Sequence, residues 1–315
     1  MLEGLAKNRI IFVTGKGGVG KSILSAALGI FFRAQGKRPL LVEFFPDKRL
    51  AHIFNLKAAV YTETAINENF SYINISSSAA LAEYLRRQLI LDVIAKFVFN
   101  TKFYRHFSDT APGLKELVAV GKLYDLEKKR DDEGSYLYDP IIVDSPQLGK
   151  FLSFIKTPQS VMNMFRIGPV KKEAEKVNGL IMSRKCSVVI VSTPDKMAIT
   201  EAIEGRQELA GMAHPALSAV VVNMAVSDNI TVTDSGYYSR RLASVSDDGQ
   251  VNAGLMPIIE KFVTYATIEK RAIQELNDSI KDIPVLTLPL IESTTSELLI
   301  AETLSTRLAS STGNL

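Results

Sequence analysis

The sequence contains little cysteine and no long apolar run, and both shortages narrow the class of protein. Cys186 is the single cysteine among 315 residues, so the chain cannot build an internal disulfide framework or a cluster of thiolate metal ligands. No signal-peptide pattern precedes residue 10, and we therefore expect the protein in the reducing cytoplasm. Because no stretch of about 18 apolar residues occurs, we expect no stable insertion into a membrane.

The sequence also lacks a strong excess of either charge. Its 37 Lys and Arg residues and 34 Asp and Glu residues leave a net charge of +3, which is too small to indicate a nucleic-acid partner. With 46% hydrophobic residues, the chain has enough apolar side chains for a sizeable core. Only one phosphate-binding motif is present, and we therefore expect a single domain that comprises residues 1–315.

The chain is organised around residues 9–27, which read R-I-I-F-V-T-G-K-G-G-V-G-K-S-I-L-S-A-A. A strand pattern at 10–13 passes directly into a glycine-rich turn and then into a helical pattern. This order fits the phosphate-binding loop G-x-x-x-x-G-K-[ST], in which backbone N–H groups and a helix N-terminus face a phosphate. We expect Lys21 at the terminal phosphates and Ser22 on Mg²⁺. The predicted nucleotide-binding residues are Gly15, Lys16, Gly17, Gly18, Val19, Gly20, Lys21, Ser22 and Ile23.

Strand and helix patterns alternate along the rest of the chain. Their order predicts an α/β fold with a doubly wound, mostly parallel sheet. The expected strands lie at residues 10–13, 39–43, 72–75 (at an edge), 141–144, 187–192, 217–223 and 284–288. The expected helices lie at residues 21–35, 161–182, 198–211, 257–279 and 295–309. Residues 227–252 are predicted as a surface loop, and residues 79–133 as a helical insertion within the single domain.

Asp144 ends one of these strands and opens the segment D-S-P-Q-L-G-K. A carboxylate at this place can orient Mg²⁺ and its water shell, as the Walker B aspartate of P-loop proteins does. We therefore predict that Ser22 and Asp144 bind the metal and that Asp144 is also part of the catalytic set. The alternative is that Asp144 caps the helix that follows.

Lys16 gives the phosphate loop a closer resemblance. The sequence G-K-G-G-V-G-K-S resembles the deviant Walker A motif of the dimeric P-loop ATPases, which include MinD, ParA, the nitrogenase iron protein and the arsenite-transport ATPase. In that group the additional lysine contacts the phosphates bound by the other subunit, where negative charge develops during phosphoryl transfer. The resemblance implies a dimer in which Lys16 acts in trans and Lys21 in its own site. A solvated loop lysine is the alternative for Lys16.

Other segments resemble the ArsA-like ATPases of the arsenite-transport and tail-anchored-protein-targeting type. Residues 144–150 resemble their second switch, D-[TA]-x-P-x-G-H, with Lys150 in place of the histidine. Further segments that are similar to bacterial members lie at residues 111–124, 166–177 and 188–202. This resemblance implies ATP and Mg²⁺ as cofactors.

Residues 220–223 are similar to the strand of this family whose terminal asparagine reads adenine through its amide. Asn223 is therefore a candidate ligand of the base. No N-K-x-D sequence follows it, so the usual carboxylate that reads guanine is missing and ATP is favoured over GTP. The alternative is that Asn223 caps the turn after the strand.

The first switch departs from the family pattern D-P-A-H-[NS]-L-S-D. Residues 45–52 read F-P-D-K-R-L-A-H and place His52 where the family carries the aspartate that positions the attacking water. His52 and the nearby Asp47 are the candidates for orienting water, while an ordinary partly packed histidine is the alternative for His52. Loss of the carboxylate predicts tight binding of Mg·ATP with slow hydrolysis. The arsenite-binding cysteines and the zinc-binding C-x-x-C of the family are absent.

Residues 85–126 form the candidate partner surface. Apolar side chains here occupy more positions than a single stripe, and they include Leu89, Ile90, Val93, Phe97, Phe99, Phe103 and Phe107. In the targeting ATPases the comparable insertion builds a groove for hydrophobic helices, which implies a hydrophobic helical client. Core packing of a helical subdomain is the alternative.

Together these features predict a cytoplasmic, dimeric, Mg·ATP-dependent ATPase of the ArsA-like type, as a homodimer or as a heterodimer with a paralogue. Its nucleotide state is expected to change a partner or client surface. One alternative is a hydrolysis-impaired ATP-binding subunit that pairs with a more complete paralogue. Another is a positioning ATPase like MinD or ParA, although residues 304–315 make a poor membrane-binding helix.

Overall fold

The computed structural model describes the chain except for residue 1 and residues 89–112, 213, 227–248, 292–295 and 311–315. Its described part contains an eight-stranded sheet in the order β3-β4-β2-β5-β1-β6-β7-β8, with only the β3–β4 pair antiparallel. The strands are β1 (Ile10–Gly15), β2 (Leu40–Phe44), β3 (Thr64–Asn67), β4 (Phe70–Ile75), β5 (Ile141–Gln147), β6 (Cys186–Ser192), β7 (Ala216–Ala225) and β8 (Val285–Pro289). The predicted α/β fold with a mostly parallel sheet is confirmed.

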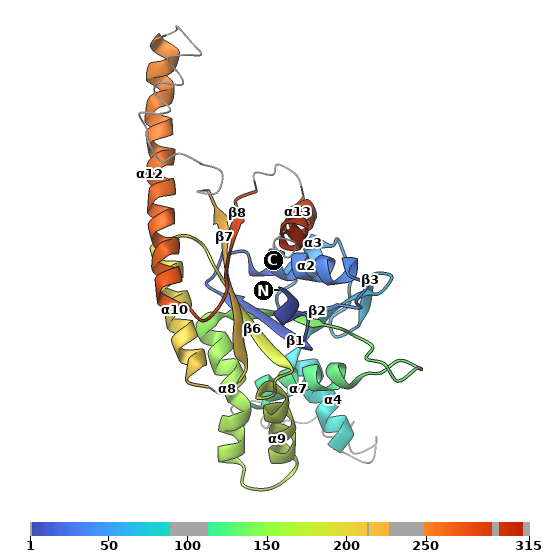
Figure 1. Cartoon of the computed structure of the whole chain (residues 1–315). Helices are drawn as coiled ribbons and strands as arrows, with labels where there is room; N and C mark the ends of the chain where they lie inside the picture. The colour runs from blue at the N-terminus through green and yellow to red at the C-terminus, as the bar shows by residue number, and fades with distance from the viewer. Residues whose placement is uncertain (1, 89–112, 213, 227–248, 292–295, 311–315) are drawn as a thin grey trace.

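Helices cover both faces of this sheet (Figure 1). One face packs against α1 (Leu2–Leu5), α2 (Lys21–Ala34), α3 (Arg49–Ile53) and α13 (Glu297–Ser310). The other packs against α4 (Ser77–Gln88), α7 (Leu114–Lys128), α8 (Leu148–Met164), α9 (Pro169–Ile181), α10 (Lys196–Ala210) and α12 (Gly249–Ser279). Successive side chains of β1 alternate between the two cores, because side chains along a strand point to opposite faces. The sheet is therefore doubly wound, as predicted.

The central strands and the first helix follow directly from their sequences. Every residue of β6, C-S-V-V-I-V-S, is buried, as a continuous apolar run should be in a strand covered on both faces. Helix α2 begins directly after Gly20 and ends at Ala34. Gly36 follows it with φ of 77°, which is the left-handed conformation that commonly ends a helix.

The predicted helix at residues 161–182 is wrong. Helix α8 ends at Met164 and α9 begins at Pro169, with Gly168 between them at φ of 106°. Proline is well suited to the first turn of a helix, and glycine readily adopts a positive φ. The apolar spacing continues across this break, so periodicity alone did not reveal it.

Two further predictions need correction. The strand predicted at residues 72–75 does not lie at the edge of the sheet, because β3 pairs with β4 on its outer side. The four-residue β3 segment T-A-I-N gave too short a pattern to be recognised. Residues 249–252, predicted as loop, belong to α12, and residues 227–248 of that loop lie outside the described residues.

The helical region at residues 79–133 contains α4 and α7, which pack against each other. Leu117, Leu123 and Leu126 of α7 are buried in the core that α8 and α9 also form. Core packing therefore describes α7. The apolar residues on which the predicted partner surface depends lie outside the described residues, namely Leu89, Ile90, Val93, Phe97, Phe99, Phe103 and Phe107.

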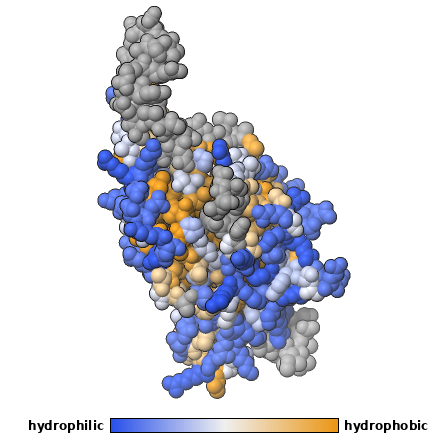
Figure 2. Space-filling model, in the orientation of Figure 1, coloured by the Kyte–Doolittle hydropathy of each residue, from blue (hydrophilic) through white to orange (hydrophobic). Residues whose placement is uncertain are grey.

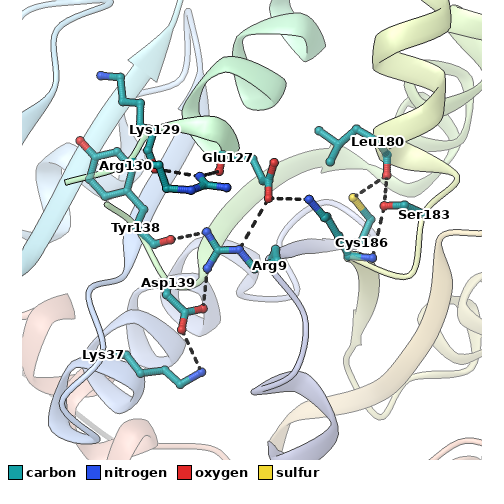
Figure 3. Close-up of polar contacts among 11 residues, drawn as sticks. Arg9, Lys37, Glu127, Lys129, Arg130, Tyr138, Asp139, Leu180, Ser183 and Cys186 are labelled. Carbon is teal, nitrogen blue, oxygen red and sulfur yellow. Dashed lines mark hydrogen bonds and ion pairs between the residues drawn. The ribbon is translucent and has the colours of Figure 1, made fainter. Parts of the chain in front are cut away.

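A polar cluster ties α7 to the amino ends of the central strands (Figure 3). Arg9, directly before β1, forms an ion pair with Asp139 at 2.9 Å and donates a hydrogen bond of 2.6 Å to the Tyr138 carbonyl. Its Nε lies 3.7 Å from Glu127 near the end of α7, and Lys185 lies 3.0 Å from the same carboxylate. Glu127 is only 1% exposed. These contacts join three strands to α7 on the edge opposite the phosphate loop.

The surface in Figure 2 is largely hydrophilic, with an apolar area beside α12. None of the helices in the described ranges combines the length and the apolar character that a membrane span requires.

Candidate functional site: the nucleotide pocket

The loop between β1 and α2 requires glycine at both of its ends. Gly15 has φ of 147°, and a Cβ there would lie 2.0 Å from the carbonyl oxygen of Val191 in β6. Gly20 has φ of 91°, and its Cβ would lie 2.3 Å from the amide nitrogen of Asn223. Any larger residue would therefore displace the backbone on which the loop rests. The loop approaches two neighbouring strands this closely because its turn is so tight.

The loop opens onto a cavity of about 850 Å³, a size that suits a nucleotide. The cavity lies at the carboxyl ends of β1, β2, β5 and β7, which is where ligands bind in open parallel sheets. Of the predicted site residues, those that line it are Gly17, Gly18, Gly20, Lys21, Ser22, Ile23, Asp47, His52, Asp144 and Asn223. The structure thus brings together most of a set drawn from four separate segments.

Three predicted ligands do not line this cavity within the part of the chain that the structure describes. Gly15 lies below the loop against β6, and Val19 is buried with its carbonyl turned toward Asn223. Lys16 is half-buried, and its charge acts on Asp195 in the turn before α10. Lys16 therefore lies beside its own cavity rather than in it, as a residue that acts on a neighbouring subunit would.

Lys21 is held at the floor of the cavity. Its ammonium donates a hydrogen bond of 2.9 Å to the carbonyl oxygen of Lys16. Burial lowers the pKa of Lys21, and the nearby carboxylate of Asp144 opposes that shift. A cation with one backbone acceptor and a partly desolvated position can bind phosphate oxygens strongly.

Ser22 and Asp144 meet below Lys21. The Ser22 hydroxyl donates a hydrogen bond of 2.5 Å to Oδ2 of Asp144. The other carboxylate oxygen, Oδ1, is buried and has no hydrogen-bond partner among the described residues. A hydroxyl beside a carboxylate with a free oxygen is a donor set that suits Mg²⁺. The described residues contain no group of three or more His, Cys, Asp or Glu that could hold a metal ion by themselves.

The carboxyl group of Asp144 should make the stability of the nucleotide-free protein depend on pH. Burial raises its pKa from 3.8 to about 7, although Ser22 and Lys21 lower it. The folded protein therefore retains a proton that the unfolded chain loses, and stability falls as pH rises from about 4 through 7. At pH 8, without nucleotide, we expect Asp144→Asn to be more stable than wild type by about 2–4 kcal/mol.

Urea unfolding at pH 4 and at pH 8 would check this expectation. The stability difference between the two proteins should nearly vanish at pH 4, because the wild-type carboxyl is then protonated in the folded state and largely so in the unfolded one. An equal difference at both pH values would show that the substitution acts through packing instead.

Asn223 contacts the phosphate loop directly. Its amide nitrogen donates a hydrogen bond of 3.0 Å to the Val19 carbonyl, and the residue is buried against Gly20. The side chain therefore holds the loop at the end of β7 and also lines the cavity. Recognition of adenine by this amide stays a prediction.

Glu43 is a site residue that sequence reasoning missed. It ends the apolar run of β2 and lines the cavity. Its carboxylate accepts hydrogen bonds from the Leu50 backbone amide at 2.9 Å, from the Asn74 amide at 3.2 Å and from the Tyr72 hydroxyl. Glu43 thereby fixes α3 against β4. An acid directly after an apolar strand, the pattern that identified Asp144, could have indicated it.

The first switch lies over the cavity between Glu43 and α13. Asp47 and His52 are both exposed and line the cavity with Lys48 and Arg49. Asn74 also bonds the Asp47 carbonyl, and Arg49 pairs with Glu297 of α13. The segment thus presents a carboxylate and an imidazole to the cavity from a backbone anchored at both ends.

A glycine-rich loop between a strand and a helix, with a serine–aspartate pair below its lysine, defines a nucleotide-binding protein of the P-loop class. The sequence model of the anion-transporting ATPase family matches residues 8–183. The chain belongs to this family, and it is accordingly an ATP-binding ATPase.

Individual relatives agree with this family. The chain is 29% identical over 253 residues to ATPase BagA of Mycobacterium tuberculosis, which covers 79% of this chain and 73% of that protein. It is 30% identical over 175 residues to an Aquifex aeolicus protein that is named after arsenical pump-driving ATPases, which covers 54% of this chain and 55% of that protein.

Proposed function

We propose that this chain is a Mg·ATP-dependent nucleotide switch that works as a dimer in the cytoplasm. The observation that carries the proposal is the Ser22–Asp144 hydrogen bond directly below Lys21, at the floor of a nucleotide-sized cavity. This arrangement places a cation, a hydroxyl and a carboxylate where the terminal phosphates of ATP would lie. Asn223 and Met224 line the same cavity at the end of β7, where the adenine side of the nucleotide would bind.

Each residue of the floor has a separate role in this proposal. Lys21 neutralises the terminal phosphates, and Ser22 with Asp144 holds Mg²⁺. When bound, the metal offsets the negative charge of the phosphates. Gly15 and Gly20 let the loop backbone approach its neighbours closely enough to direct its N–H groups into the cavity.

Slow hydrolysis is part of the same proposal. Hydrolysis requires a group that orients water in line with the γ-phosphate. The first switch offers His52 and Asp47 instead of the aspartate that the family carries at position 52. This difference favours a second candidate function, a hydrolysis-impaired ATP-binding subunit that pairs with a paralogue. The nucleotide state of either form would act on a partner or a hydrophobic helical client.

The dimer is tested through Lys16, which lies outside its own cavity. We expect Lys16→Ala to bind ATP as a monomer but to lose ATP-dependent dimerisation and turnover, because the charge that reaches the other subunit is gone. Light scattering and single-turnover phosphate release measure the two effects, with the exposed Lys57→Ala as control.

Complementation sharpens this test. A mixture of Lys16→Ala and Lys21→Ala subunits should regain some turnover, because a mixed dimer retains one site that has both lysines. If Lys16→Ala dimerises and hydrolyses ATP like wild type, the role in trans is wrong.

A further inference from the structure

Helix α12 extends well beyond the sheet that it covers (Figure 1). The backbone amide of Val226, directly after β7, donates a hydrogen bond of 2.8 Å to Glu269 in α12. The carboxyl end of β7 therefore lies at the level of Glu269. Residues 249–268 precede this level in a helix that ends at Ser279 beside the start of β8. At 1.5 Å per residue, they form an arm that extends about 30 Å past the carboxyl edge of the sheet.

The arm carries an exposed apolar stripe. Its side chains are Leu255, Ile258, Phe262 and Tyr265, which are 39%, 52%, 50% and 51% exposed. Their spacing of three, four and three residues places them on one face of the helix, in the a and d pattern of helices that pack against a partner. Val263 and Ala266 on a neighbouring face are buried, whereas Thr264 on the opposite face is exposed. The stripe is thus separate from the face by which the helix packs.

The area of the stripe limits what it can do alone. Four half-exposed side chains can bury on the order of 400 Å² on each copy, about half of the 800 Å² that a stable interface takes from each partner. The stripe is therefore too small to hold two proteins together by itself. It needs a second contact on the same side of the molecule.

The carboxyl edge of the sheet supplies that second contact. Lys16 lies on this edge, and a role in trans requires another subunit to face it. The exposed Met197 at the start of α10 lies close by, since Asp195, on which the charge of Lys16 acts, caps α10. A subunit that covers Lys16 would stand beyond the carboxyl edge, within the 30 Å that the arm extends.

We propose that the stripe on the α12 arm binds a second copy of this chain in the ATP-bound dimer. The proposal rests on the proposed function, because the Lys16 contact brings the second copy into reach. Each arm then buries its stripe on the partner, and the two contacts together provide the area that neither has alone. Dimerisation consequently depends on nucleotide at one contact and on apolar burial at the other.

Two substitutions in the stripe test the proposal. The Ile258→Asp/Phe262→Asp protein should bind ATP with wild-type affinity but dimerise at least about tenfold more weakly with a non-hydrolysable ATP analogue, because burial of two carboxylates opposes association. Thr264→Asp adds a carboxylate to the opposite face of the arm and should dimerise like wild type. Analytical ultracentrifugation measures the dimer, and calorimetry measures ATP binding.

A fluorescent probe gives a second measurement that tolerates a milder change. An environment-sensitive dye on Ile258→Cys should shift to the blue when the analogue is added, whereas the same dye on Thr264→Cys should not. The native Cys186 stays unlabelled because it is buried and burial raises the pKa of its thiol to about 12. If the double-aspartate protein fails to fold, this probe decides the question.

The two proposals fail in different ways. If wild type dimerises with the analogue and the stripe variant does so equally well, with no dye shift at position 258, the arm proposal is wrong and the Lys16 dimer stands. If wild type stays monomeric with the analogue, the proposed dimer is wrong and the arm proposal falls with it. A weakened stripe variant with an intact Thr264→Asp control supports both.

Discussion

Lys21→Ala is expected to weaken ATP binding by a factor of about 30 or more, because it removes a charge-assisted contact of roughly 2–3 kcal/mol. The ammonium of Lys21 lies on the cavity floor beside Asp144, with one hydrogen bond to the Lys16 carbonyl. Few other cations can replace it, since the remaining basic residues that line the described cavity are Lys48, Arg49 and His52 of the first switch.

Isothermal titration calorimetry with Mg·ATP measures this loss. Lys57→Ala, which removes an exposed lysine outside the cavity, should bind like wild type. Circular dichroism should show an intact fold for both proteins, because the Lys21 side chain contributes little to the core. Unchanged binding by Lys21→Ala would mean that the phosphates lie elsewhere.

Arg9→Ala is expected to lower the free energy of unfolding by about 3 kcal/mol or more, because it breaks a buried ion-pair network. The guanidinium pairs with Asp139, bonds the Tyr138 carbonyl and stacks 3.5 Å from the centre of the Tyr136 ring (Figure 3). Its loss leaves Glu127 buried, with Lys185 as its remaining ion-pair partner among the described residues. The edge of the sheet that these residues join lies opposite the nucleotide cavity.

Urea unfolding, followed by circular dichroism, measures this change. Lys156→Ala breaks a salt bridge to Glu208 in which both side chains are about half exposed, and it should cost at most about 1 kcal/mol. Equal effects of the two substitutions would contradict the view that burial makes the Arg9 network important. ATP affinity of folded Arg9→Ala should stay normal, because the cavity is formed at the other ends of the strands.

Most of the central sheet could be predicted because its strands are buried on both faces. Such strands are written as continuous apolar runs, and β1, β5, β6 and β7 were found in this way. The short β3 carries only four residues with half of them exposed, so its sequence resembles a loop. The break between α8 and α9 was missed for a different reason, since apolar residues keep their helical spacing on both sides of Gly168.

The site shows the same division. The phosphate loop is a contiguous motif whose backbone geometry follows from glycines at fixed spacing, so the sequence identified it and its lysine. Glu43 could not be recognised from its neighbours alone. Its role depends on Tyr72 and Asn74 of β4 and on the amide of Leu50, and these three meet only when β2 and β4 pair.

The sequence by itself determined the class of fold, the phosphate loop and the family, because each of these depends on local spacing and on the order of segments. Only the tertiary structure placed Asp144 against Ser22 at 2.5 Å, set Lys16 beside its own cavity rather than in it, and extended α12 past the edge of the sheet. The physical reason is that these features are contacts between residues far apart in the chain. Strand order and helix packing decide which of them meet, and neither is written in any single segment.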